Sequence, residues 1–144
     1  TPTVFSGWGQ IADPQSLLFV PIFVALAFLN ANPTFIAMDM TVFGALLIGG
    51  LALILWFRDR RWHPAGALVA ALAFAWGASA YWRVQHTGQV VSYGVLPLAV
   101  LLLDRALVRQ SIGYGFFAGV VAGFLAVGRD QIALLGLYIL VFQT

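Results

Sequence analysis

Residues 34–57, TFIAMDMTVFGALLIGGLALILWF, form an apolar run that contains a single charged side chain, Asp39. At about 1.5 Å per helical residue, a run of this length is ample for a hydrocarbon core of about 30 Å. The basic stretch RDRRWHP follows directly at residues 58–64. Together they predict a membrane-crossing helix that ends in a tight, charged turn.

The composition of the whole chain also indicates an integral membrane protein. Of its 144 residues, 62% are hydrophobic and 8% are charged, whereas soluble domains carry about 25% charged residues. The net charge of +2 is too small to suggest binding of nucleic acid. The chain has no cysteine, which excludes a disulfide framework, a thiolate nucleophile and a cysteine metal site.

Further apolar runs on both sides of residues 34–57 set the expected architecture. Residues 1–15 carry two Gly and two Pro and are typical of a loop. The run within residues 16–31, with Ser16 as a plausible N-cap, is too short to cross and predicts an interfacial or re-entrant helix. We expect an all-α, polytopic transmembrane bundle of about five crossings, the last incomplete, within a larger polytopic protein. The expected crossings are residues 34–57, 65–82, 90–103, 112–127 and 132–144.

The arginines predict the orientation of the bundle. If the crossings alternate, five arginines lie on one face and two on the other, which assigns the first face to the cytoplasm. The five are Arg58, Arg60, Arg61, Arg105 and Arg109, and the two are Arg83 and Arg129. The cytoplasmic stretches, residues 58–64 and 104–110, are interpreted as plain topology signals. The external face, periplasmic in a Gram-negative cell, receives residues 1–15, 83–89 and 128–131.

The external arginines are candidates for binding an anionic group. A guanidinium can hold a phosphate through two parallel hydrogen bonds, so Arg83 and Arg129 would suit a phosphate-bearing substrate. The alternative is that each arginine ends a helix and pairs with lipid head groups or with a neighbouring aspartate.

His86 and Asp13 are the candidates for acid–base chemistry. The imidazole of His86 suits proton transfer near neutral pH, although a histidine in a polar loop also serves as a hydrogen-bonding or packing residue. Asp13 precedes an apolar stretch, where a carboxylate equally suits a turn or a helix dipole. No second His or carboxylate stands at ligand spacing beside His86, so a divalent metal has no support. His63 is assigned no role.

Small residues and one acid inside the crossings suggest other roles. Gly115, Gly119 and Gly123 repeat at four-residue spacing, a pattern that favours close helix packing. Asp39 is an acid within a crossing, which raises a transport pathway as a hypothesis, although its position near a helix N-terminus also explains it.

The loop motifs resemble those of YfhO-like bacterial membrane proteins over nearly the whole chain. Ala-Asp-Pro-Gln at residues 12–15 is similar to the end of their first external loop. Residues 76–109, with Gln85-His86, Pro97-Leu98 and Leu103-Asp104-Arg105, are similar to their central crossings. The sequence Gly-Arg-Asp-Gln at residues 128–131 stands where they often have a Gly-His-Pro-Gln type loop, with the His and Pro replaced here.

The resemblance implies a C-type glycosyltransferase of the bacterial inner membrane that uses a polyprenyl-phosphate sugar as donor on the external face. The usual catalytic base of such enzymes lies early in the first external loop, and this chain is expected to begin after it. The implied substrate-binding residues are Arg83, Gln85, His86, Gln89, Arg129, Asp130 and Gln131. A different class of function is a non-catalytic membrane subunit that packs on a partner through Gly115, Gly119 and Gly123. A transporter segment with Asp39 in its pathway is a third.

Overall fold

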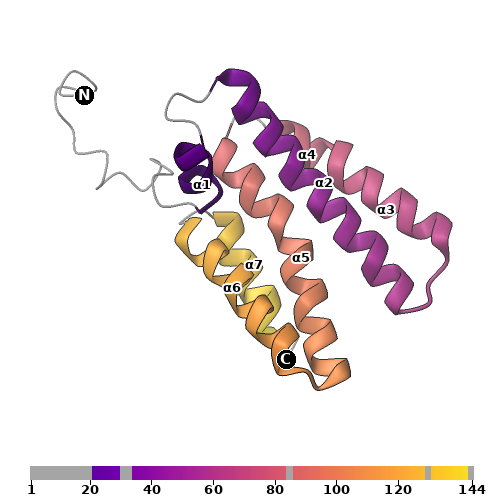
Figure 1. The fold of residues 1–144 in the computed structure, drawn as a ribbon. Coiled ribbons are helices and arrows are strands. Elements are labelled where there is room, and N and C mark those ends of the chain that lie inside the picture. The colour runs from indigo at the N-terminus through magenta and orange to yellow at the C-terminus, as the bar shows by residue number, and fades with distance from the viewer. Residues whose placement is uncertain (1–20, 30–33, 84–85, 129–130, 143–144) are drawn as a thin grey trace.

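The computed structural model describes residues 21–29, 34–83, 86–128 and 131–142, and every regular element in these ranges is an α-helix (Figure 1). The helices are α1 (Pro21–Leu29), α2 (Phe35–Asp59), α3 (Pro64–Trp76), α4 (Ala78–Arg83), α5 (Thr87–Arg109), α6 (Ile112–Gly128) and α7 (Gln131–Phe142). Within the described residues, α2, α5 and the segment Pro64–Tyr81 are long and apolar enough to cross a membrane. The prediction of an all-α chain with helices of membrane-crossing length is confirmed for these ranges.

The turn between α2 and α3 is built by side-chain and backbone caps. Arg61 takes a left-handed conformation, with φ 57°, and its amide donates to the carbonyl of Arg58 at 3.0 Å. Nδ1 of His63 then accepts from the amide of Ala65 at 3.2 Å, and Pro64 occupies the first turn of α3, where a missing N–H costs nothing. The role of His63 in the structure is therefore an N-cap.

The predicted crossing 65–82 is not one helix, because the chain breaks at Gly77. This residue is extended, with ψ 164°, and a Cβ there would collide with the carbonyl oxygen of Ala73. Beside the break, the hydroxyl of Tyr93 donates to the carbonyl of Phe74 at 3.2 Å, a group that a continuous helix would have satisfied with its own amide. The rings of Phe74 and Tyr93 stack at 4.4 Å. The predicted range 65–82 spans this glycine-dependent interruption, and the segment Pro64–Tyr81 remains long and apolar enough to cross a membrane.

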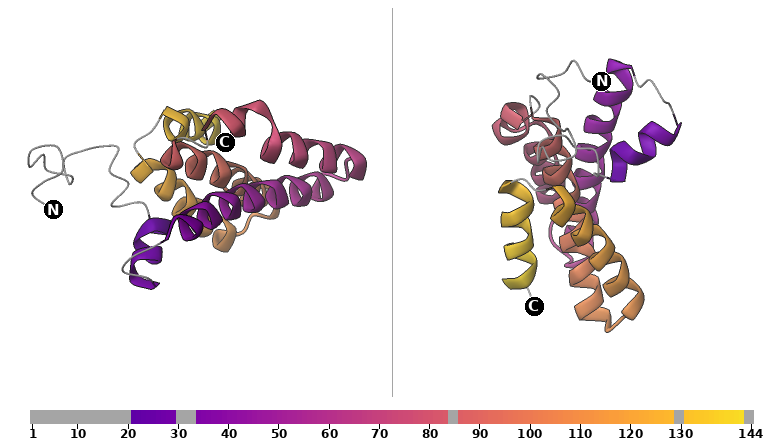
Figure 2. Two further views of the ribbon diagram at one scale, coloured as in Figure 1. Left: turned by 90° about the horizontal axis from the view of Figure 1, so that it is seen from above. Right: turned by 90° about the vertical axis from the view of Figure 1, so that its left-hand side faces the viewer.

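Helix α5 lies at the centre of the bundle and packs against α2, α6 and α7. It runs from Thr87 to Arg109, longer at both ends than the predicted 90–103, and stops where Gln110 turns left-handed, with φ 50°. Helices α2 and α5 run in the same direction, with α3 and α4 on one side of the pair and α6 and α7 on the other (Figures 1 and 2).

Glycines allow the helix backbones to approach closely. A Cβ on Gly94 of α5 would lie 2.7 Å from the backbone of Ala45 in α2, and one on Gly49 would collide with the carbonyl oxygen of Gly94. A Cβ on Gly136 of α7 would lie 2.9 Å from the side chain of Leu96 in α5. Close backbone approach is how helices pack in lipid, where the hydrophobic effect does not drive them together.

The remaining helices agree broadly with the sequence-based ranges. Helix α6 spans Ile112–Gly128, and α7 spans Gln131–Phe142. Helix α1 begins at Pro21, so the expected N-cap Ser16 lies outside the described residues. Ile22 and Phe23 of α1 pack against the buried pair Ala45 and Val91.

Candidate functional site

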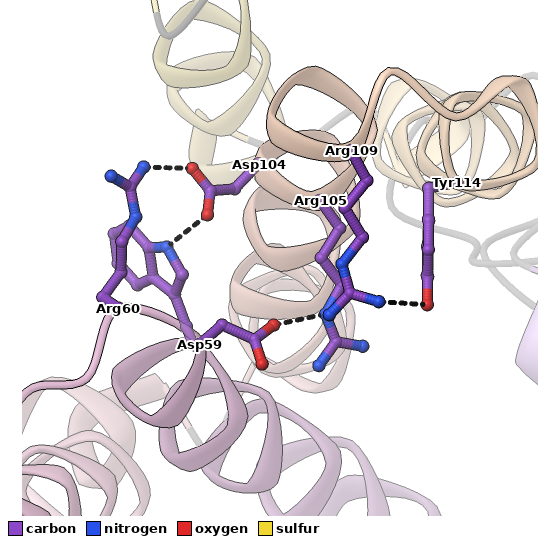
Figure 3. Close-up of polar contacts among 7 residues, drawn as sticks. Asp59, Arg60, Asp104, Arg105, Arg109 and Tyr114 are labelled. Atoms are coloured by element: carbon purple, nitrogen blue, oxygen red, sulfur yellow. Dashed lines mark hydrogen bonds and ion pairs between the residues drawn. The ribbon is translucent and has the colours of Figure 1, made fainter.

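The ends of α2 and α5 are joined by two reciprocal ion pairs (Figure 3). The dipeptide Asp-Arg occurs at residues 59–60 and again at residues 104–105. Nε of Arg105 donates to Oδ2 of Asp59 at 2.5 Å, and the guanidinium of Arg60 pairs with Oδ1 of Asp104. Each dipeptide therefore supplies the acid for the other's arginine.

Asp104 is the buried member of this cluster, with 6% of its surface exposed. Its second oxygen, Oδ2, accepts from the indole Nε1 of Trp56 at 3.2 Å. Burying a carboxylate costs free energy unless it is paired and hydrogen-bonded. Both oxygens of Asp104 have a donor, so the side chain fixes α5 against α2.

A second contact extends the cluster to α6. Nη1 of Arg109 lies 3.4 Å from the hydroxyl of Tyr114, and its guanidinium carbon is 5.5 Å from the ring centre. The guanidinium carbon of Arg105 is 5.8 Å from the same ring. Both distances fit cation–π attraction, so one aromatic ring in α6 faces two arginines of α5.

These contacts hold α2, α5 and α6 together at one end of the bundle. Both aspartates are engaged in ion pairs with arginines, which assigns them a structural role. No group of three or more His, Cys, Asp or Glu that could hold a metal ion occurs in the described part of the chain. The interpretation of residues 58–64 and 104–110 as plain topology signals was incomplete, because these arginines also tie helices together. The repeated Asp-Arg dipeptide was the signal in the sequence.

Three of the predicted external site residues can be placed in full. His86 is exposed and immediately precedes α5, without a side-chain cap hydrogen bond. Gln89 lies half-buried in the first turn of α5, and Gln131 is exposed at the start of α7. All three lie toward the end of the bundle opposite the ion pairs, where α4 leads into α5 and α6 into α7 (Figure 1).

The other predicted site residues are described partly or not at all. Arg83 is the last residue of α4, and its side chain lies outside the described part of the structure. Asp13, Gln85, Arg129 and Asp130 lie outside the described residues altogether. Whether these groups meet in one pocket stays a prediction.

Most of the residues singled out within the crossings have open surroundings. Asp39 is exposed in α2. Gly115 lies near α5, since a Cβ there would be 3.9 Å from Cβ of Ala106. A Cβ on Gly119 or Gly123 would meet nothing within 4 Å among the described residues. The close helix approaches described above instead use Gly49, Gly94 and Gly136.

Comparison with known proteins gives no match to any protein-family model, curated protein or solved structure.

Proposed function

We propose that the chain is the membrane-embedded part of a glycosyltransferase-like protein that transfers a sugar from a polyprenyl-phosphate donor. In this proposal α2, the α3–α4 segment, α5, α6 and α7 are five crossings of a bacterial inner membrane, and α1 lies at the interface. The ion-paired end faces the cytoplasm, where the excess of arginine belongs by the positive-inside rule. The opposite end, with His86 and Gln131, faces the exterior and receives the donor.

The observation that supports this proposal is the placement of two polar junctions at one end of the bundle. The α4–α5 junction follows Arg83 and contains His86, and the α6–α7 junction contains Arg129. Both α5 and α7 begin at this end (Figure 1), so the positive ends of two helix dipoles are directed toward it. Such an end suits an anionic lipid-linked phosphate.

The chemistry assigned to each residue follows from its donors and acceptors. Arg83 and Arg129 hold the phosphate of the donor and stabilise the negative charge that develops on it as the sugar leaves. His86, Gln85 and Gln89 offer hydrogen bonds to the hydroxyl groups of the sugar or acceptor. Asp130 and Gln131 border the same pocket, and Asp13 or His86 is the candidate for activating the acceptor.

The proposal is tested by sugar transfer in proteoliposomes that contain the full-length protein and a polyprenyl-phosphate sugar. Arg83→Ala should lower turnover by a factor of about 10² or more, the loss typical when a group that stabilises developing charge is removed. Arg61→Ala is the matched control, because it removes an exposed arginine from the opposite end. Unchanged turnover in Arg83→Ala, with normal expression, would refute the mechanism.

The open face of α6 favours a second candidate function, that of a non-catalytic subunit in a larger membrane complex. Gly119 and Gly123 meet no described side chain, and Phe116 and Phe124 beside them are 66% and 43% exposed. A partner helix could approach this face closely. In that case Gly119→Leu would abolish co-purification of the complex, whereas Arg83→Ala would leave it intact.

A further inference from the structure

The ion-paired end of the bundle carries more positive charge than its carboxylates offset. Residues 58–64 and 104–110 contain five arginines and two aspartates. Arg60 and Arg105 have carboxylate partners. No such partner is found for Arg58, Arg61 or Arg109 in the part of the chain that the structure describes. These three side chains are exposed, so a residual positive charge faces the surroundings.

Arg109 is the exposed arginine whose surroundings the structure defines. Arg105, one helical turn before it, is bonded to Asp59, whereas Arg109 has no carboxylate partner among the described residues. A guanidinium has five N–H donors, so Arg109 keeps donors for another anion even though its Nη1 donates to the hydroxyl of Tyr114.

Tyr114 adds a neutral donor to the same place. Its ring lies against Arg105 and Arg109, and its hydroxyl oxygen accepts from Arg109. The hydroxyl proton finds no acceptor within the described residues, and a phenol can donate while it accepts. Figure 3 shows the tyrosine alongside the two arginine side chains. A phosphate oxygen beside Arg109 would be within reach of this proton.

The position of this cluster at the ends of α2 and α5 indicates that its ligand is a membrane lipid. The apolar helices α2 and α5 end at Asp59 and Arg109, so the cluster reaches the head-group layer when these helices cross a bilayer. Trp62, which is half exposed and packs edge-on against Phe57 at 4.9 Å, has the interfacial position that tryptophan favours. An anion at this level is supplied by the lipid itself.

We propose that Arg109 and Tyr114 bind the phosphodiester of an anionic phospholipid at the membrane surface. A guanidinium group and a hydroxyl donor side by side match the oxygen atoms of a phosphate. The surplus positive charge disfavours choline and ethanolamine head groups, whose ammonium would be repelled, and favours the uncharged glycerol of phosphatidylglycerol. This site lies at the opposite end of the bundle from the proposed donor site and does not depend on it.

The full-length protein is placed in nanodiscs that contain equal amounts of phosphatidylglycerol and phosphatidylcholine and is then extracted. Native mass spectrometry counts the molecules of each lipid that stay bound. The wild type should retain phosphatidylglycerol preferentially. Arg109→Gln should lower its retention about fivefold, the effect of losing one interfacial arginine contact, and Tyr114→Phe should lower it by a smaller factor. Arg61→Gln is the matched control, since it removes the same charge from the same end but lies outside the contact between Arg109 and Tyr114.

The outcomes separate a defined site from a diffuse surface charge. Loss in Arg109→Gln with retention in Arg61→Gln supports the site, provided that both variants keep the wild-type unfolding temperature. Equal loss in both variants would overturn it, because net charge alone would then explain binding. Displacement of the lipid by millimolar inorganic phosphate would also overturn it, since the site would then be one for a free ion.

Discussion

Asp59, the last residue of α2, accepts a 2.5 Å hydrogen bond from Nε of Arg105 in the final turns of α5. Because α2 and α5 run parallel (Figure 1), this bond joins two helix C-termini whose dipoles both end in partial negative charge. Arginines at these ends offset that charge, and the aspartates fix which arginine faces which helix. The pair stabilises an arrangement that helix dipoles alone would disfavour.

The Asp59–Arg105 pair should contribute measurably to stability. Arg105→Gln is expected to lower the free energy of unfolding by about 1–3 kcal/mol, the range for hydrogen bonds to charged groups. Arg109→Gln, one helical turn further and on the exposed surface, should change it by less than about 0.5 kcal/mol. Unfolding in detergent, followed by circular dichroism, measures both. Equal effects would show that the ion pair adds nothing beyond general charge.

Removing the charge of Asp104 should destabilise the bundle more than removing that of Asp39. Asp104→Asn keeps the size of the side chain but loses the pairing with Arg60 and turns an acceptor into a donor in a buried site, at a cost of about 2 kcal/mol or more. Asp39 is exposed, so Asp39→Asn should be close to neutral. The same unfolding measurement compares them, and a stable Asp104→Asn variant would contradict the assigned role.

Two glycine substitutions should change the free energy of unfolding in opposite directions. Gly94→Ala puts a Cβ against the backbone of Ala45, which forces α2 and α5 apart and should cost about 1–3 kcal/mol. Gly119→Ala meets open space and should stabilise α6 by up to about 1 kcal/mol, because alanine is the better helix former. Thermal unfolding of the isolated chain distinguishes them. A destabilised Gly119→Ala would instead indicate that this face is packed.

The break between α3 and α4 should require glycine at position 77, so that substitution by alanine destabilises the protein. Gly77→Ala would place Cβ on the carbonyl oxygen of Ala73, so the break must change and a loss of about 1–3 kcal/mol is expected. Gly66→Ala, on the same helix, meets only an ordinary contact with Phe57 at 3.5 Å and serves as the control. A cysteine introduced at position 83, at the end of α4, would report through its rate of labelling by a thiol reagent whether α4 reorients. Unchanged accessibility and stability in Gly77→Ala would argue against a fixed break.

Much of the helical framework could be predicted from hydropathy, because apolar runs and their polar breaks are properties of the sequence alone. Residues 34–57 and 112–127 match α2 and α6 to within a few residues. The end of α5 could not be placed in this way. Asp104 and Arg105 look like the end of an apolar run, but the helix continues to Arg109, and their side chains pair with Arg60 and Asp59.

The contacts between helices were less predictable, because they depend on which faces meet. The regular spacing of Gly115, Gly119 and Gly123 favours α6 as a closely packed helix, whereas the close α2–α5 approach uses Gly49 and Gly94, which no short-range spacing connects. The external candidate residues follow from their chemistry and from the expected orientation of the chain. Only His86, Gln89 and Gln131 can be placed in full, at one end of the bundle (Figure 1), and the external position of that end stays a prediction.

The pairing of Asp59 with Arg105 spans 46 positions, and the α3–α4 segment lies between them. During synthesis α2 therefore emerges before the arginine that pairs with Asp59. Formation of this link requires α5 to lie beside α2, whereas α6 and α7 follow later in the chain and pack on α5. The bond thus reports the first stage of bundle assembly and not its end.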